Sequence, residues 1–457
     1  MARKRKKTKK QKIVELEALE QINLNAAGLD IGAAEIYAAV PKGCDTESVR
    51  CFQTYTRSLH ALADWLEACG IDTVAMESTG IYWIPIYEIL DQRGFEVLLV
   101  NARHIKNVPG RKTDVLDCQW IQQLHTYGLL QGSFRPADNI CALRALIRHR
   151  DMLIRYRSSH VQHMQKALHM MNVQLTNVLS DITGVTGMKI IRSIVSGDHD
   201  PQGLAEYRDY RCGKSKEEIA LALEGNYRAE HLFALKQALE LFDLYSQKIK
   251  DCDFEIEVMY SKFEPQVDIA EKPLKDRKRK RNKPVGNEPD FNLRLYLYQM
   301  TGVDLTQIDG INALTAQAVL SEIGIDMSKW KTGKHFSSWL SVCPYNDITG
   351  GKVIKSGTKK SQNRAAKALR LAARSLTHSD SYLGAFFRRI KARTDAPTAI
   401  TATAHKLARI IYAMLRDQSE YIDPGAAFFE EQYRQRAVKN LQRKAKRLGF
   451  AVVPVAA

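Results

Sequence analysis

The sequence predicts a mixed α/β domain followed by a mostly helical remainder. Between residues 21 and 137, short apolar runs alternate with segments of helical periodicity. From 138 to 265 the apolar residues recur at spacings of three and four, which is typical of long helices. Beyond residue 291, two alanine-rich helical segments are predicted at 363–376 and 401–415.

The α/β part is expected to contain five strands and three helices. The strands are predicted at 24–30, 34–40, 49–55, 73–77 and 95–100. The helices are predicted at 60–69, 84–92 and 112–126. Because three strands come first and helix and strand then alternate, the sheet is expected to be mixed.

The remaining segments differ in charge and periodicity. Residues 1–20 form a basic arm, and 266–290 a basic mobile linker. Between them, the apolar spacing of residues 138–265 predicts long antiparallel helices or a coiled coil. A buried apolar stripe in a helical bundle would give the same spacing. The first of these helices is dense in arginine and histidine, and Arg148 and Arg155 are candidates for binding a nucleic-acid backbone.

The charge balance points to a polyanionic partner. The chain has 457 residues and a formal net charge of +17, and lysine and arginine gain affinity for nucleic acids by releasing counterions. An acidic membrane surface is the alternative, but no apolar run is long enough for a membrane-spanning helix. The eight cysteines form no Cys-x-x-Cys pair, which argues against structural zinc and favours reduced thiols in the cytosol.

Four carboxylates stand out in this basic chain. Asp30 and Glu77 each close an apolar run, and Asp114 and Asp117 lie three residues apart on one face of a predicted helix. Each acid alone is expected to be a turn, cap or solvent-facing residue. Together they could surround one or two Mg²⁺ ions, because hard cations prefer several oxygen ligands.

The C-terminal part, 291–457, contains a second group of candidates. Residues 305–323 resemble a helix-hairpin-helix in which Gly310 lets backbone amides approach a phosphate, although a plain helix connection is equally expected. After a polar loop at 345–352, a lysine-rich stretch is expected either to bind nucleic acid or to be a solvated loop. Its lysines are Lys352, Lys355, Lys359 and Lys360.

These features together resemble the insertion-sequence one-ten family of transposases, which are DEDD recombinases directed by a bridge RNA. The resemblance covers nearly the whole chain. Its most specific parts are Glu77-Ser78-Thr79-Gly80, the stretch 112–117, and Gly310 with the later Pro344 and Gly350-Gly351-Lys352. It implies a RuvC-like ribonuclease-H fold for 21–137, with the four acids as Mg²⁺ ligands. It also implies a transposase domain at 291–457.

The resemblance further implies a hydroxyl nucleophile in the C-terminal domain. The family uses a serine directly before a glycine, a few residues after a proline, to form a covalent link with DNA phosphate. In this chain that position holds Thr349, which keeps the hydroxyl but adds a β-methyl group that restricts χ1. Ser356, which also precedes a glycine, is the fallback candidate.

The function that the resemblance implies is an RNA-guided DNA recombinase of a bacterial insertion sequence. Its partners are double-stranded donor and target DNA and a structured guide RNA. The family assembles from dimers into tetramers, and the protein is expected in the cytoplasm, associated with the nucleoid. Two alternatives stay open: a metal-dependent nuclease that attacks branched DNA with water, and a non-catalytic nucleic-acid-binding protein.

Overall fold

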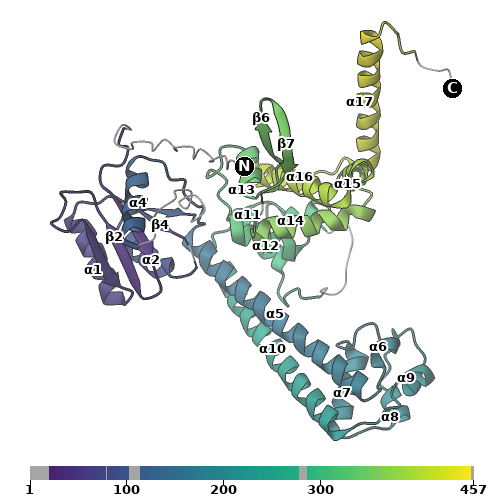
Figure 1. Cartoon of the computed structure of the whole chain (residues 1–457). Coiled ribbons are helices and arrows are strands. Elements are labelled where there is room, and N and C mark those ends of the chain that lie inside the picture. Colours follow the sequence, from purple (N-terminus) through teal and green to yellow (C-terminus); the bar gives the residue numbers. More distant parts are fainter. Residues whose placement is uncertain (1–19, 79, 102–113, 277–285, 360, 454–457) are drawn as a thin grey trace, which may run out of the picture. The chain divides into compact units, whose positions relative to one another are not determined.

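The computed structural model describes residues 20–78, 80–101, 114–276, 286–359 and 361–453 (Figure 1). The chain divides into two compact units, Met1–Arg135 and Pro136–Ala457. Each unit has its own core. Across the described ranges, no helix combines the length and apolar character needed to span a membrane.

The first unit is built on a five-stranded sheet with the order β3-β2-β1-β4-β5. The strands are β1 (Ala26–Ile31), β2 (Glu35–Ala39), β3 (Val49–Gln53), β4 (Thr73–Glu77) and β5 (Glu96–Val100). The pairs β1/β2 and β2/β3 are antiparallel, whereas β1/β4 and β4/β5 are parallel. The predicted mixed sheet is thus confirmed.

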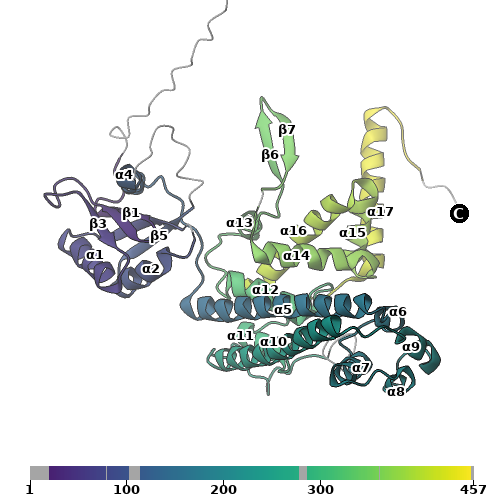
Figure 2. The ribbon, with the colours of Figure 1, turned by 60° about the horizontal axis from the view of Figure 1, so that its bottom comes forward.

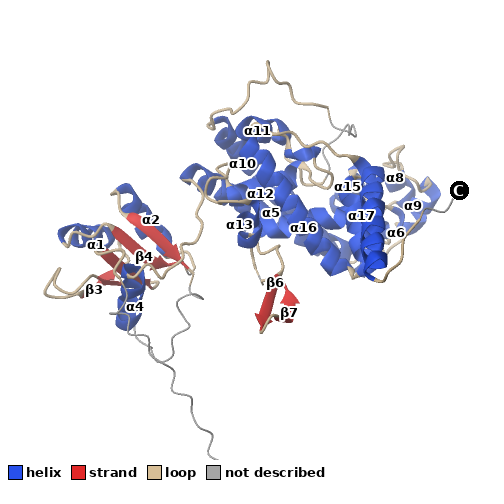
Figure 3. Cartoon of the chain, turned by 90° about the horizontal axis from the view of Figure 1, so that it is seen from above, coloured by secondary structure: helices blue, strands red, loops and turns tan. Residues whose placement is uncertain are grey.

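Helices cover both faces of this sheet, as Figures 2 and 3 show. On one face, α1 (Thr56–Ala68) and α2 (Trp83–Gln92) bury alternate strand residues such as Leu29 and Met76. The other face is covered by α4 (Asp114–Thr126), whose Ile121 packs with residues of β4 and β5. The three helices agree with the expected segments, and α1 begins four residues earlier than the predicted start at residue 60.

Two long helices dominate the first half of the second unit. Helices α5 (Asp138–Met170) and α10 (Ala229–Ser261) pack side by side in antiparallel directions (Figures 1 and 2). The buried Arg150 of α5 forms an ion pair with Asp253 of α10, and it also donates to the carbonyl oxygen of Asn287 at 2.8 Å. The prediction of long antiparallel helices is confirmed, while coiled-coil packing stays a prediction.

The rest of the second unit is also mainly helical. Near one end of the α5/α10 pair, four short helices share a core with it: α6 (Leu175–Val178), α7 (Val185–Ser196), α8 (Pro201–Ala205) and α9 (Lys216–Ala222). The C-terminal helices are α11 (Leu293–Thr301), α12 (Ala313–Ile323), α13 (Gly333–Trp339), α14 (Arg364–Ser375), α15 (Tyr382–Arg393), α16 (Ala396–Asp417) and α17 (Gly425–Arg447). The described part of this unit also contains two short 3₁₀ segments, η2 (Leu305–Gln307) and η3 (Leu376–His378).

A β-hairpin interrupts the helices where the sequence predicted a polar loop at 345–352. Strands β6 (Tyr345–Thr349) and β7 (Lys352–Gly357) pair antiparallel and project from the helices (Figures 1 and 2). Gly350 and Gly351 have φ values of +55° and +75°, which suit the two-residue turns that join such strands. The loop prediction was therefore wrong, because the glycine pair is a hairpin turn.

Candidate active site

Two of the four predicted acids are neighbours at one edge of the sheet. The parallel register of β1 and β4 pairs Leu29 with Met76, so the next residues, Asp30 and Glu77, follow side by side. Both strands end here, and both side chains belong to the face that α4 covers, because strand residues alternate between faces. Asp30 and Glu77 are each half-buried.

Helix α4 lies directly on β1 because residue 28 is a glycine. A Cβ atom at Gly28 would lie 2.3 Å from the backbone nitrogen of Gln122 and 2.5 Å from the carbonyl oxygen of Cys118. No side chain fits between backbone atoms at these distances. The glycine is therefore required for close helix–strand approach rather than for an unusual φ.

The direction of α4 follows from contacts near its C-terminus. The His125 Nε2 atom lies 2.8 Å from the hydroxyl of Thr73, the first residue of β4. The backbone nitrogen of Ile22 donates to the carbonyl oxygen of Thr126 at 2.8 Å. The helix therefore runs opposite to β1 and β4, and its first turn points toward the strand ends that hold Asp30 and Glu77.

The first turn of α4 supplies the remaining acids. Asp114 begins the helix, although its side chain lies outside the described residues, and Asp117 is half-buried one turn later. Cys118, the residue after Asp117, is buried. Burial, together with the negative charges of Asp30 and Asp117, raises the pKa of its thiol to about 12. The close approach of Gly28 to the backbone of Cys118 brings this part of α4 alongside β1, two residues before Asp30.

The donor set is suited to a hard cation, since every candidate ligand is a carboxylate oxygen. Among the side chains that the structure describes, no three His, Cys, Asp or Glu residues already surround a single point. That description does not include the side chain of Asp114. Asp30 and Glu77 thus lie at one sheet edge, and Asp117 lies in the helix turn that points toward it.

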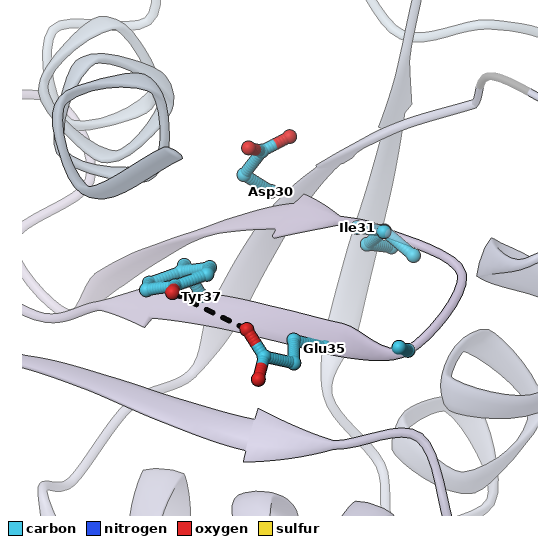
Figure 4. Close-up of a pocket in the computed structure, with 6 residues that line it drawn as sticks. Asp30, Ile31, Glu35 and Tyr37 are labelled. Carbon is cyan, nitrogen blue, oxygen red and sulfur yellow. Dashed lines mark hydrogen bonds between the residues drawn. The ribbon is translucent and has the colours of Figure 1, made fainter. Parts of the chain in front are cut away.

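A shallow pocket of about 400 Å³ adjoins Asp30, as Figure 4 shows. Tyr37 pairs with Asp30 across β1 and β2, and its hydroxyl donates to Glu35 at 3.3 Å. Hydrogen bonding to Cys51 and the charge of Glu35 raise the pKa of Tyr37 to about 12. Sequence reasoning missed Tyr37 and Glu35, although the predicted hairpin of the first two strands could have placed them beside Asp30.

Replacing Gly28 with alanine is expected to push α4 away from β1. The new Cβ would meet backbone atoms, so the helix must shift, which costs about 1–3 kcal/mol in overpacked cores. Amide hydrogen exchange in α4 should become about 10-fold faster or more. Gly213→Ala is the control, because nothing lies within 4 Å of a Cβ there; equal exchange in both variants would contradict the packing argument.

The first unit is expected to lose stability in mild acid through His125. This side chain is 5% exposed, and burial lowers its pKa to about 4. The unfolded state therefore binds a proton near pH 6.5 that the folded state does not accept, so stability falls as the pH drops below 6.5. Between pH 7 and pH 5 the loss should be about 2 kcal/mol.

Hydrogen exchange of α4 and β4 at pH 7 and pH 5 measures this loss. In His125→Gln the pH dependence should flatten, whereas the exposed His149→Gln should keep the wild-type dependence. An unchanged pH dependence in His125→Gln would show that another group is responsible.

The two candidate nucleophiles occupy different ends of the β6/β7 hairpin, in the second unit. Thr349 is the last residue of β6, directly before the glycine turn, and pairs with Lys352. Ser356 lies near the base, where its hydroxyl donates to Asn346 Oδ1 at 2.9 Å. The hydroxyl of Thr349 is therefore at the projecting tip, while that of Ser356 is engaged in a cross-strand hydrogen bond.

The predicted nucleic-acid contacts fall into two groups. Lys352, Lys355 and Arg155 are exposed, and the exposed Lys359 lies 5.0 Å from the ring centre of Tyr345. Lys360 lies outside the described residues.

Two other candidates contact the protein itself. Arg148 donates to both carboxylate oxygens of Glu322 in α12 at 2.7 and 2.9 Å, so it ties α5 to α12. Gly310 has a φ of +87°, and a Cβ there would lie 2.8 Å from the carbonyl oxygen of Ala372. This glycine is thus needed for packing against α14, whatever else its backbone binds.

Comparison with known proteins places the chain in a family. Residues 27–173 match a DEDD transposase model of IS110, described as a transposase. Residues 304–388 match a model described as a transposase of the IS116/IS110/IS902 family. The chain belongs to the IS110 family of transposases. The resemblance drawn from the sequence motifs is therefore confirmed.

One curated relative is a "Probable family 20 transposase" of Pseudomonas aeruginosa. It is 26% identical over 122 residues, which are 26% of this chain and 36% of that protein. The chain thus matches about a third of the length of this relative. The first matched segment contains Asp30, Glu77, Asp114 and Asp117, and a DEDD transposase domain suggests a divalent metal ion.

Proposed function

We propose that this IS110-family chain is an RNA-guided DNA recombinase that links itself covalently to DNA through a side-chain hydroxyl. The observation that supports this best is the packing of α4 on Gly28. It directs the first turn of α4, with Asp114 and Asp117, toward the strand ends that hold Asp30 and Glu77. This arrangement agrees with a RuvC-like domain at 21–137.

The acids are proposed to hold Mg²⁺. Asp30, Glu77, Asp114 and Asp117 would be the ligands, and the all-oxygen donor set fits this ion. Bound Mg²⁺ would stabilise the negative charge that develops on a scissile phosphate and lower the pKa of an attacking hydroxyl. The chain contributes the fixed positions of the two strand acids and the helix turn beside them.

Thr349 is proposed as the nucleophile. Its Oγ1 forms a bond to DNA phosphorus while the bond from phosphorus to the deoxyribose 3′ oxygen breaks. The hydroxyl proton passes to solvent, and the departing 3′ oxygen takes up a proton from solvent and leaves as a 3′-hydroxyl. The phosphodiester is thereby conserved as a threonine–phosphate link, which a partner DNA end can later attack. The tip position of Thr349 supports this role over Ser356, whose hydroxyl is bonded to Asn346.

The proposed partners are donor and target DNA duplexes and a structured guide RNA. The net charge of +17 and the exposed Lys352, Lys355 and Arg155 support nucleic-acid binding, with Lys359 and Lys360 in the same stretch. Family resemblance supports assembly from dimers to tetramers and a cytoplasmic, nucleoid-associated location. A coiled coil in 138–265 and a phosphate-binding helix-hairpin-helix at Gly310 complete this proposal.

Detection of the covalent link tests the proposal. The full chain, supplied with the guide RNA and DNA of its parent element, should form a denaturant-resistant protein–DNA adduct with Mg²⁺ and none after chelation by EDTA. Peptide mass spectrometry should find the nucleotide remnant on Thr349. DNA cleavage without an adduct would instead establish a nuclease that uses water, and unchanged DNA would establish a binding protein without catalysis.

A further inference from the structure

A small pocket in the second unit combines aromatic rings with positive charge and contains no acidic residue. It lies between α15, α16 and α17 and has a volume of about 160 Å³. Its rings are Tyr382, Phe386, Phe429 and Tyr433, and its cations are Arg389, Arg393, Lys406 and Arg436. We name it the α15–α17 pocket.

Two of the four cations of this pocket lie against its aromatic rings. The Lys406 ammonium lies 4.3 Å from the ring centre of Tyr382 and 4.6 Å from that of Phe386. The Arg389 guanidinium lies 3.4 Å from the ring centre of Tyr433. Within the described part of the chain, none of the four cations forms an ion pair with a carboxylate. The site therefore has positive charge available for an anion.

The size of the pocket restricts what it can take. Pockets for small molecules usually measure about 300–1,000 Å³, so this one suits a single planar ring system and not a whole cofactor. Aromatic side chains and arginine planes are the surfaces on which unpaired bases stack. Gln432 adds an amide to the lining that can hydrogen-bond to a base edge.

Helix α17 extends this chemistry beyond the pocket. Residues 432–447 contain seven lysines and arginines and no acidic residue. Arg436, Lys439, Arg443 and Lys446 follow one another at spacings of three and four, so they line one helical face that starts at the pocket. A row of cations leading from a ring-lined pocket matches a nucleic-acid strand better than an isolated phosphate or a lipid headgroup.

We propose that the α15–α17 pocket binds one unpaired nucleotide, with its base against the rings and its phosphate on the cations, while the adjoining strand follows the basic face of α17. This pocket proposal rests on the proposed function only in assuming that the chain binds nucleic acid. Single-stranded RNA and single-stranded DNA both offer an unpaired base next to a phosphate, and the test below distinguishes which of the two binds.

The test measures binding of the full chain to fluorescent ten-nucleotide probes by anisotropy: single-stranded DNA, single-stranded RNA, duplex DNA and a DNA backbone without bases. Tyr433→Ala should weaken binding to one or both single strands by at least about fivefold, because replacing an aromatic ring on which a base stacks with alanine typically causes a loss of this size. It should leave the duplex and base-free probes within about twofold of wild type. The probe with the larger loss identifies RNA or DNA as the source.

Two matched variants on α17 control for folding and charge. Phe428 is 49% exposed but does not line the pocket, so Phe428→Ala should bind like wild type. Arg436→Gln should weaken single-strand binding more than Arg434→Gln, which removes the same charge outside the pocket. The proposal would be wrong if Tyr433→Ala weakened binding to all four probes equally, or if Arg436→Gln and Arg434→Gln weakened single-strand binding equally.

Catalysis does not enter this measurement, because binding is compared in EDTA on an Asp30→Asn background. If the binding pattern holds but no covalent adduct ever forms in the active chain, the recombinase proposal fails and the pocket stands. If the adduct forms but the paired variants bind alike, the pocket fails and the recombinase stands.

Discussion

Asp30→Asn is expected to abolish strand exchange while the first unit stays folded. The substitution keeps the shape of the side chain but removes the charge at the strand end beside Glu77 and the start of α4. Loss of one group that stabilises transition-state charge typically lowers rates by about 100- to 1,000-fold. Adduct formation at saturating Mg²⁺, measured on the parent element DNA, gives the comparison.

A carboxylate on the opposite face of the sheet provides the matched control. Asp91 is exposed near the end of α2, so Asp91→Asn removes the same charge without changing the acidic edge. We expect wild-type adduct levels from it. Hydrogen exchange of α4 shows whether the Asp30→Asn protein is folded like wild type. If a folded Asp30→Asn protein formed the adduct at the wild-type level, Asp30 would have no catalytic role.

Thr349→Ala is expected to eliminate the covalent adduct. Removing a catalytic nucleophile lowers turnover by about 10⁴-fold or more. Every residue of β6 is exposed, so Thr349→Ala does not disturb a core and the loss would report on the hydroxyl. Thr349→Ser keeps the hydroxyl and removes the β-methyl group, so its adduct should form at least as fast as that of wild type.

Ser356→Ala separates the two hydroxyls. It breaks the hydrogen bond to Asn346 but leaves Thr349 in place, so the adduct should persist at a level close to that of wild type. A nucleotide remnant on Ser356 in the Thr349→Ala protein would transfer the role to the serine. In that case the Ser356→Ala protein would form no adduct.

The sheet could be predicted from sequence because its strands are short apolar runs bounded by turn residues. Strand β4 matches the prediction at both ends, and β1 begins two residues later than predicted. The hairpin at 345–357 was missed for the opposite reason. Every residue of β6 and β7 is exposed, so neither strand has an apolar face that would mark it.

The acids could be identified as candidates, but their adjacency could not be derived from sequence. It depends on the parallel register of β1 and β4 and on the contact between Gly28 and α4. Both are products of tertiary packing. The pairing of Arg148 with Glu322 joins residues 174 positions apart, which is why an arginine that looked available for nucleic acid contacts α12 instead.

The isolated hairpin has a consequence for the timing of the reaction. Two strands without a covering layer are only marginally stable in water, so a substrate surface that covers β6 and β7 would stabilise and order them further. The entropy lost in that ordering lowers affinity for any surface that fits poorly. If Thr349 is the nucleophile as proposed, its hydroxyl would be aligned only on a well-matched DNA, so the ordering of the hairpin would itself discriminate between substrates.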